Sequence, residues 1–294
     1  MSQDAFETTA HSRRRARMSS AFAALCLGAT ALCVLILVLL IWEILWQGLP
    51  WLNAQLLTSF PSVYPEKAGI AAALVSSLWL ITLTGLVSVP VGVGAAVYLE
   101  EYAQASRWRR LVQLNIANLA GVPSIVYGIL GLGLFVRMMA LQRSILAGSL
   151  TLSLVVLPIV ILAAQEALRA VPGSIRQASF ALGATRWQTV WHQVLPAATP
   201  GIMTGVILAI SRAMGEAAPL VAMGAAATFI TFIPLSPADD FSALPVQIYD
   251  WTSRPQTEYH HVAAAAIVVL LSVLILLNST AVFVRYHYGK RIRW

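Results

Sequence analysis

Long stretches without a charged residue are the feature that most constrains this chain. Five such stretches are rich in apolar side chains, and each exceeds the ~20 residues that a helix needs to cross a bilayer. They are Met18–Trp42, Ala68–Leu99, Leu111–Val136, Ser144–Gln165 and Val262–Val284. Of the 294 residues, 59% are apolar and 11% are charged, against ~45–50% and ~25% in typical soluble domains. The sequence therefore excludes an ordinary soluble enzyme and a disordered chain, and it predicts a polytopic all-α membrane protein.

A sixth apolar region, from Gly201 to about Phe232, is interrupted by Arg212 and Glu216. It can be read as one span with buried charges, or as two spans, 187–211 and 217–238. The positive-inside rule separates these readings, because Lys and Arg concentrate in short cytoplasmic loops. With six spans both termini share one side, and that side collects most of the 19 Lys and Arg residues: Arg13, Arg14, Arg15, Arg17, Arg107, Arg109, Arg110, Arg169, Arg176, Arg186, Arg285, Lys290, Arg291 and Arg293.

We therefore predict six transmembrane helices with both termini cytoplasmic, in a multi-pass membrane protein. The expected organisation is a cytoplasmic tail over 1–17, a first transmembrane helix over 18–46, a core over 65–285 and a second cytoplasmic tail over 286–294. Within the core, the expected spans cover about 70–99, 112–136, 144–165, 201–232 and 262–284, with a cytoplasmic loop at 166–200.

Motifs that bind nucleotides or metals are not found in the sequence. There is no GxxxxGK[ST] phosphate-binding loop and no HExxH or CxxC pattern. We therefore expect this chain to bind no cofactor and no metal of its own. Its net charge of +7 belongs mainly to the cytoplasmic loops, so no nucleic-acid partner is predicted.

The expected cytoplasmic loop begins with a helix pattern after Pro172. Ser174 and Gln177 have the spacing of a capping box. An apolar face then follows with helical spacing, made by Ile175, Ala178, Ser179 and Leu182. Gly183 has the position of a glycine that ends a helix. The segment therefore predicts a short helix that stops at a tight turn.

A second helix pattern starts directly after this turn. Thr185 and Gln188 form another capping-box spacing, and the same helical face recurs at Trp187, Val190, Trp191 and Val194. Leu195-Pro196 is expected to end this helix. Two readings fit the resulting hairpin: it rests on the inner leaflet as an amphipathic element, or it protrudes and docks into a groove of a soluble partner.

Arg212 and Glu216 are four residues apart, so they lie on the same side of a helix. A charge at the bilayer centre costs ~2.5–3.5 kcal/mol or more. The two could pair to help pack the bundle, but Arg before Glu is the weaker helical order. Intramembrane ionisable residues usually line a water-filled path, and a guanidinium binds oxyanions through parallel donors. We favour a path for an anionic substrate along this pair.

Ser124 and Tyr127 offer further hydroxyl groups on the third span, beside Pro123, which is expected to kink it. A serine hydroxyl usually bonds back to a helix carbonyl, and we favour that reading for Ser124. Close helix approach is expected at the glycines of this span, Gly128, Gly131 and Gly133.

The remaining polar residues have simpler interpretations. Glu100 and Glu101 are expected to be solvated at the cytoplasmic end of the second span, and Asn278 is expected to make an interhelical hydrogen bond. The outer loop Ser236–His261 is acidic. It either faces a periplasmic carrier protein or is simply solvated.

The hairpin resembles the EAA loop of ABC-importer permeases, which reads EAA, three residues, Gly, nine residues, Ile, any residue, Leu-Pro. Here Gln177 replaces the Glu, Ser179 the second Ala and Gln193 the Ile, whereas Gly183 and Leu195-Pro196 keep their spacing. In that family the loop is a pair of coupling helices that fits a cleft on the ATPase subunit. The resemblance therefore implies a coupling role for Gln177, Ala178, Ser179, Gly183, Trp187, Leu195 and Pro196.

Three phrases together resemble the phosphate-specific branch of these permeases: Asn118–Gly128, Ala181–Trp187 and Arg212–Glu216. Tyr98–Tyr102 (YLEEY) is more similar to the PstA-type member than to its PstC-type partner. The resemblance covers roughly residues 65–285. It implies a type I importer fold, a permease subunit of an ATP-driven phosphate importer, and a phosphate route along Arg212 and Glu216.

The partners implied by this resemblance are a homologous PstC-type permease, two copies of an ATP-binding subunit and a periplasmic phosphate-binding protein. ATP and Mg²⁺ would be held by the ATP-binding subunits, so this chain is expected to be a transport subunit rather than an enzyme. Other readings stay open: a permease for sulfate or molybdate, a secondary transporter or channel without an ATPase, or a membrane scaffold.

Overall fold

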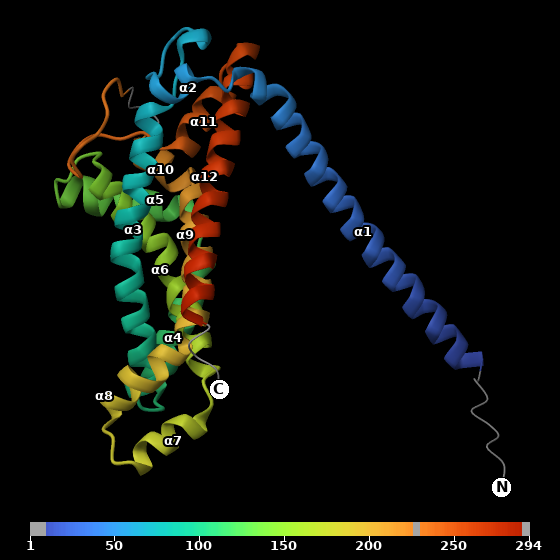
Figure 1. The fold of residues 1–294 in the computed structure, drawn as a ribbon, viewed down its shortest axis with the longest axis vertical. Coiled ribbons are helices and arrows are strands. Elements are labelled where there is room, and N and C mark those ends of the chain that lie inside the picture. Colours follow the sequence, from blue (N-terminus) through green and yellow to red (C-terminus); the bar gives the residue numbers. More distant parts are fainter. Residues whose placement is uncertain (1–9, 226–229, 290–294) are drawn as a thin grey trace.

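Figure 1 shows the computed structural model of the chain, which describes residues 10–225 and 230–289. Across these residues the protein is helical and contains no β-strand, in agreement with the predicted all-α class. Within this described part of the chain, five helices are long and apolar enough to cross a membrane, and a sixth crossing is obtained when one sharply bent helix pair is counted as a single span.

Three long helices form the centre of the bundle. They are α3 (Ala71–Val97), α6 (Ile145–Arg169) and α9 (Leu195–Gly215). A Cβ added to Gly205 of α9 would overlap the Cβ of Ala163 in α6, so these two backbones lie in close contact. In lipid, where burial of apolar surface contributes little to association, such close approach is a main source of helix packing.

Polar side chains add hydrogen bonds between the long helices. Thr84 Oγ1 in α3 donates to the carbonyl oxygen of Ser149 in α6 at 3.2 Å. Ser211 in α9 is hydrogen-bonded to Asn278 in α12 (Thr257–Gly289), which confirms the interhelical bond expected for Asn278. Each bond satisfies a polar group that would be costly to leave unpaired in hydrocarbon.

Helix α1 (Ala10–Gly48) diverges from the bundle (Figure 1). The C-terminal end of α1 packs on α12, where a Cβ on Gly48 would lie 2.7 Å from the carbonyl carbon of Ala264. None of its described apolar window is buried, so most of α1 presents its apolar side chains to the surroundings.

The outer end of the bundle is closed by short elements. Helices α2 (Ala54–Thr58) and α11 (Leu244–Thr252) lie there, with 3₁₀ turns at 49–51 and 65–67 (Figure 1). Trp251 and Tyr259 are fully buried among them, and the Tyr259 hydroxyl donates to the carbonyl of Ser62 at 2.8 Å.

The expected third span is not a straight helix. Helix α4 (Arg107–Ala120) and helix α5 (Ser124–Gly131), which continues as a π-helical segment to Met138, meet at an angle of 99°. The kink expected at Pro123 is confirmed, and the expected span over 112–136 falls on this bent helix pair rather than on one straight helix. Proline lacks an N–H and moves the preceding residue out of the helical region, so the helix breaks here.

The expected fifth span also differs from the structure. Helix α9 ends at Gly215, and α10 (Ala218–Met223) follows after a short break. Six residues cannot cross a bilayer, so residues 201–232 do not form one continuous span. The candidate span in the structure is Arg186–Gly215, which matches the first of the two spans considered from the sequence, 187–211. Among the described residues, 217–238 does not form a second spanning helix. Pro219 explains the break, because it removes the backbone donor to the carbonyl of Gly215. Residues 226–229 of this region lie outside the described part.

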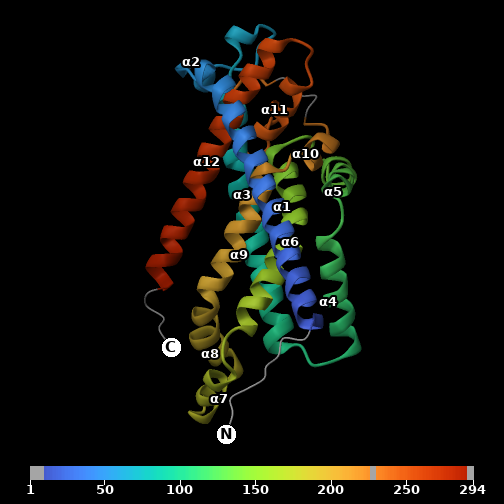
Figure 2. The same ribbon diagram turned by 90° about the vertical axis from the view of Figure 1, so that its right-hand side faces the viewer.

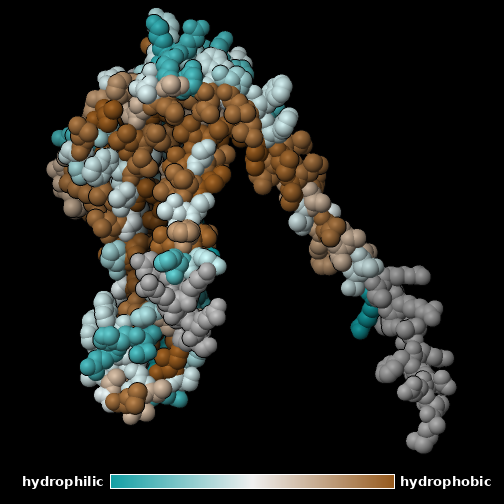
Figure 3. All heavy atoms as spheres, viewed as in Figure 1, coloured by the Kyte–Doolittle hydropathy of each residue, from teal (hydrophilic) through white to brown (hydrophobic). Residues whose placement is uncertain are grey.

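Helices α7 (Gly173–Ala181) and α8 (Arg186–Thr189) protrude from one end of the bundle. Figures 1 and 2 show that the start of α1 and the end of α12 point toward this same end, which we assign to the cytoplasm. Figure 3 shows an apolar band over the middle of the bundle and the adjoining part of α1, with hydrophilic residues at both ends of the bundle. The basic residues Lys290, Arg291 and Arg293 lie outside the described residues.

Candidate functional site

The Arg212–Glu216 pair is formed in the structure. Arg212 Nε lies 3.1 Å from Glu216 Oε1, with Arg212 half-exposed and the Glu216 side chain 18% exposed. Arg212 is in the last turn of α9, whereas Glu216 has already left the helix, with φ −82° and ψ 108°. Its carboxylate is therefore carried by the non-helical link to α10, and a movement of that link would change the pair.

This pair lies about halfway along the bundle. Ala209 and Ala213, which flank Arg212 on α9, pack in one cluster with Val156 and Val160 from the middle of α6. These alanines are buried, whereas Leu208 and Arg212 are exposed on another side of α9. The guanidinium thus stands at mid-depth on a face of α9 that the rest of the chain leaves uncovered.

Ser124 and Tyr127 lie at the start of α5. The Tyr127 hydroxyl donates to the carbonyl oxygen of Leu119 at 2.8 Å, across the bend between α4 and α5. Tyr127 is 8% exposed, so its hydroxyl is engaged in closing this bend, while Ser124 is half-buried. The hydrogen bond gives Tyr127 a structural role beside its predicted place on the substrate path.

Helix α5 packs closely on α10. A Cβ on Gly128 would overlap backbone atoms of Pro219, and one on Gly131 would overlap the side chain of Thr151. The close approach expected at these two glycines is confirmed, whereas Gly133 faces open space. Through this packing α5 is held against the segment that directly follows Glu216.

The cytoplasmic hairpin has the predicted turn. Gly183 adopts φ +81°, in the left-handed region that favours glycine. Thr185 and Gln188 form a complete capping box at the start of α8. The hydroxyls of Ser179 and Thr189 lie 2.8 Å apart and connect α7 with α8. These contacts define the shape of the hairpin.

Two details of the hairpin prediction are wrong. The first capping box is not formed, because α7 already begins at Gly173 and Pro172 is its N-cap. The second helix does not end at Leu195-Pro196: α8 continues through a π-helical segment, Val190–Val194, into α9 as one membrane-crossing helix. The π-helical segment ends two residues before Pro196. Its wider turn lets the helix continue past a residue that has no N–H to donate.

The predicted coupling residues divide into two groups. Gln177, Ala178 and Trp187 are exposed, and the rings of Trp187 and Trp191 stack with centroids 5.5 Å apart. Ser179, Gly183 and Leu195 instead support the hairpin or pack toward the bundle, and Pro196 is exposed at the start of α9.

An exposed apolar residue at the tip was missed by the sequence reading. Leu182, which was placed on the inner face of the first helix, is 90% exposed. It directly precedes the turn at Gly183, where the helical pattern no longer sets the direction of a side chain. With Trp187 and Trp191, more than half exposed, it forms an apolar surface at the end of the protein.

The acidic residues of the outer loop have different surroundings. Asp239 accepts backbone hydrogen bonds from Leu235 and Ser236, and Asp250 pairs with Arg254 at 2.8 Å. Asp240 and Glu258 are exposed. The loop is therefore partly structural, and two of its carboxylates remain accessible to a partner.

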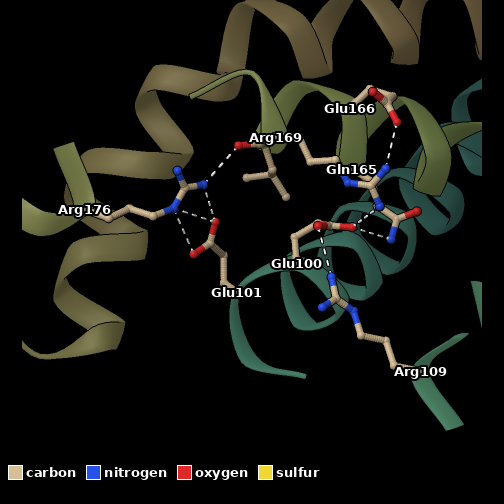
Figure 4. Close-up of polar contacts among 8 residues, drawn as sticks. Glu100, Glu101, Arg109, Gln165, Glu166, Arg169 and Arg176 are labelled. Carbon is tan, nitrogen blue, oxygen red and sulfur yellow. Dashed lines mark hydrogen bonds and ion pairs between the residues drawn. The ribbon is translucent and has the colours of Figure 1, made fainter. Parts of the chain in front are cut away.

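Glu100 and Glu101 are not solvated, contrary to the expectation from the sequence. Their side chains are only 9% and 10% exposed. Both lie on a π-helical turn, Tyr98–Tyr102, that extends α3. Glu100 pairs with Arg109 and Arg169, and Glu101 pairs with Arg176 (Figure 4). An isolated buried carboxylate is costly, and a single sequence contains no signal that pairs them with arginines so distant in the chain.

The architecture can now be compared with known proteins. The chain superposes on a subunit of a bacterial alginate ABC transporter, solved in complex with an alginate pentasaccharide-bound periplasmic protein, with a TM-score of 0.64. The superposition covers 91% of this chain and 94% of that subunit at 14% identity. The fold is that of a type I ABC importer permease.

Sequence relatives define the family. Residues 88–294 match the family described as binding-protein-dependent transport system inner membrane component. The phosphate transport system permease protein PstA of Haemophilus influenzae is 32% identical over 249 residues, which are 85% of this chain and 86% of that protein. The probable ABC transporter permease protein YqgI of Bacillus subtilis is 35% identical over 217 residues, 74% of each chain. The chain belongs to this family of inner-membrane transport components, and it is a transport subunit rather than an enzyme.

Proposed function

We propose that this chain is the PstA-type permease subunit of an ATP-driven importer of inorganic phosphate. The observation that carries the proposal is the guanidinium of Arg212, which lies at mid-depth on an uncovered helix face. Arginine stays protonated in any local environment and presents parallel donors that match a phosphate oxyanion. The name of the relative from Haemophilus influenzae supports phosphate as the cargo.

Glu216 would make phosphate binding reversible. In the structure its Oε1 accepts a hydrogen bond from Arg212 Nε, one of the donors that a phosphate would use. A transport site must release its substrate, and a site that binds too tightly would not. Phosphate and Glu216 would therefore exchange places on Arg212 as the path opens and closes. The backbone break after Gly215 supports this role, since irregular backbone at membrane depth is tolerated where it is buried in protein or lines a cavity.

The partners follow from the same proposal. A homologous PstC-type permease would cover the open face of α9, so that the path runs between the two subunits and away from lipid. Two copies of an ATP-binding subunit, which hold ATP and Mg²⁺, would bind the exposed hairpin surface formed by Leu182, Trp187 and Trp191. A periplasmic phosphate-binding protein would deliver phosphate at the outer end, where Asp240 and Glu258 are accessible. Closure of the ATPases would move the hairpin and alternate access to the path.

The test is phosphate uptake by the assembled complex in liposomes. Arg212→Ala is expected to abolish uptake while the complex still assembles. Arg212→Lys is expected to transport poorly, because an ammonium lacks the planar fork of donors. Arg254→Lys is the matched control: Arg254 also pairs with a carboxylate four residues away, but at the outer end, and this variant is expected to transport normally.

Three results would contradict the proposal. Normal phosphate uptake by Arg212→Ala at matched protein levels would remove Arg212 from the path. ATP hydrolysis stimulated by sulfate- or molybdate-loaded binding protein, but not by the phosphate-loaded one, would assign a different oxyanion. Uptake that continues without any ATPase subunit would favour a secondary transporter or channel.

A further inference from the structure

The π-helical turn Tyr98–Tyr102, here called the junction turn, connects four helices through three consecutive side chains. Glu100 contacts α4 and α6, Glu101 contacts α7, and Tyr102 contacts α8. The turn itself extends α3. π-Helical turns are rare and are frequent at functional sites. The junction turn is therefore a meeting point between the bundle and the cytoplasmic hairpin.

Glu100 holds the bundle side of this junction. Its carboxylate accepts hydrogen bonds from Arg169 Nη2 at 2.6 Å, from Gln165 Nε2 at 2.9 Å and from Arg109 Nη2 at 3.2 Å. Figure 4 shows these groups converging on Glu100 from α4 and α6. Three donors on a carboxylate that is 9% exposed compensate its loss of hydration, and they tie the end of α3 to both neighbouring helices.

Glu101 holds the hairpin side. Arg176 of α7 reaches it with Nη2 at 2.6 Å and with Nε at 3.2 Å (Figure 4). The same guanidinium donates to the carbonyls of Leu168 and Val171 at 3.0 and 2.8 Å. Carbonyls at the end of a helix have no partner within that helix, and a cation is favourable there. One side chain thus joins α7 to the ends of both α3 and α6.

The chain connectivity shows why this pair matters. Helix α8 continues directly into α9, and α7 follows α6 after residues 170–172. A displacement of the hairpin therefore reaches α6 and α9 along the backbone. Helix α3 has no such covalent connection, because residues 103–172 separate it from α7. Contact through Glu101, together with the stacking of Arg186 over the Tyr102 ring at 6.0 Å, links α3 to the hairpin.

We propose that Glu101 and Arg176 are positioning residues that make α3 follow the movement of the cytoplasmic hairpin, and so couple ATP hydrolysis to substrate movement. Neither residue touches the substrate or the ATP. This inference rests on the proposed function, in which the hairpin is moved by an ATPase. It gives the YLEEY motif a mechanical role that its sequence did not reveal.

The test measures the number of phosphates transported per ATP hydrolysed in the reconstituted complex. Glu101→Gln keeps the shape of the side chain and removes its charge, so the paired guanidinium loses its charged acceptor. We expect the complex to assemble and to hydrolyse ATP, while the transport-to-ATP ratio falls by about tenfold, as for loss of a charge-assisted, bidentate contact. Arg176→Gln should lower the ratio at least as much, because it also removes the donors to the carbonyls of Leu168 and Val171. The double variant should be no worse than Arg176→Gln alone.

Glu166→Gln is the matched control. Glu166 also pairs with an arginine of this region, Arg169, at 2.9 Å, but its side chain is 72% exposed. Exposed pairs of this kind contribute little, so its transport-to-ATP ratio should equal that of the unmodified complex.

Three outcomes would overturn the proposal. They are an unchanged ratio in Glu101→Gln, additive losses in the double variant, or loss of ATPase binding by Glu101→Gln, which would show a purely structural role. The unmodified complex separates this test of coupling from the test of which substrate is transported. If the unmodified complex transports another anion, the ratio is measured with that anion, and failure of the phosphate assignment is recognised independently of failure of the coupling role.

Discussion

Gly183 offers the sharpest test of the hairpin, because its substitution isolates backbone strain. Its φ is +81°, and a Cβ built there meets no atom within 4 Å. A Cβ therefore meets open space, and the cost of adding it arises from the left-handed backbone. That cost is ~1–2 kcal/mol for an L-residue. A turn destabilised by this amount lowers the fraction of hairpins ready to dock.

The expected consequence is weaker binding of the ATPase subunit. Since ~1.4 kcal/mol corresponds to tenfold in affinity, Gly183→Val should weaken binding by roughly 5- to 30-fold. Gly183→Asn should be much milder, because asparagine tolerates the left-handed region. The measurement is titration of the purified permease in nanodiscs with the ATPase subunit.

Gly173→Val provides the control within the same hairpin. A Cβ at Gly173 also meets open space, but its φ is not in the left-handed region, so ATPase binding should be unchanged. Equal losses in Gly173→Val and Gly183→Val, or normal binding by Gly183→Val, would refute the role assigned to backbone strain at this turn.

Two further predictions concern packing and capping. Gly205→Leu should destabilise the protein by ~1–3 kcal/mol, because its Cβ would overlap Ala163, and thermal unfolding in detergent should show a lower Tm. Gly94→Leu, at a site open to the surroundings, should leave the Tm unchanged. Equal Tm values for the two variants would contradict the close α6–α9 contact. Thr185→Ala should lower the stability of the hairpin by ~1 kcal/mol by removing the N-cap, and it should weaken ATPase binding. Ser174→Ala, at the capping box that does not form, should bind the ATPase normally. The reverse result would show that the caps are misassigned.

Local sequence signals predicted several features correctly. Apolar runs predicted the membrane helices, Pro123 predicted a kink, and Gly183 predicted the hairpin turn. Each of these depends on interactions within a few residues: the length of an apolar helix, the missing N–H of proline, or the freedom of glycine at positive φ. They are visible in a single sequence because the physics that produces them is local.

Features that depend on distant segments were predicted less well. Glu100 and Glu101 looked solvated, because two of the arginines that pair with them, Arg169 and Arg176, lie 69 and 75 residues away along the chain. Pro196 looked like a helix end, because a preceding π-helical segment cannot be read from spacing. The predicted fifth span, 201–232, extended beyond the end of α9 at Gly215, because hydropathy does not show the break in the helix there.

The amino-acid sequence by itself determined that this chain crosses a membrane as a bundle of helices and that one pair of charges lies within an apolar segment, and it predicts which side faces the cytoplasm. Hydropathy and charge are properties of each residue, and the bilayer sorts them without reference to the rest of the fold. The tertiary structure decided that Arg212 stands on an uncovered face at mid-depth, and that two buried carboxylates join α3 to the hairpin. Both depend on which helices pack against each other, since burial and partnership of a charge are set by residues far away in the sequence.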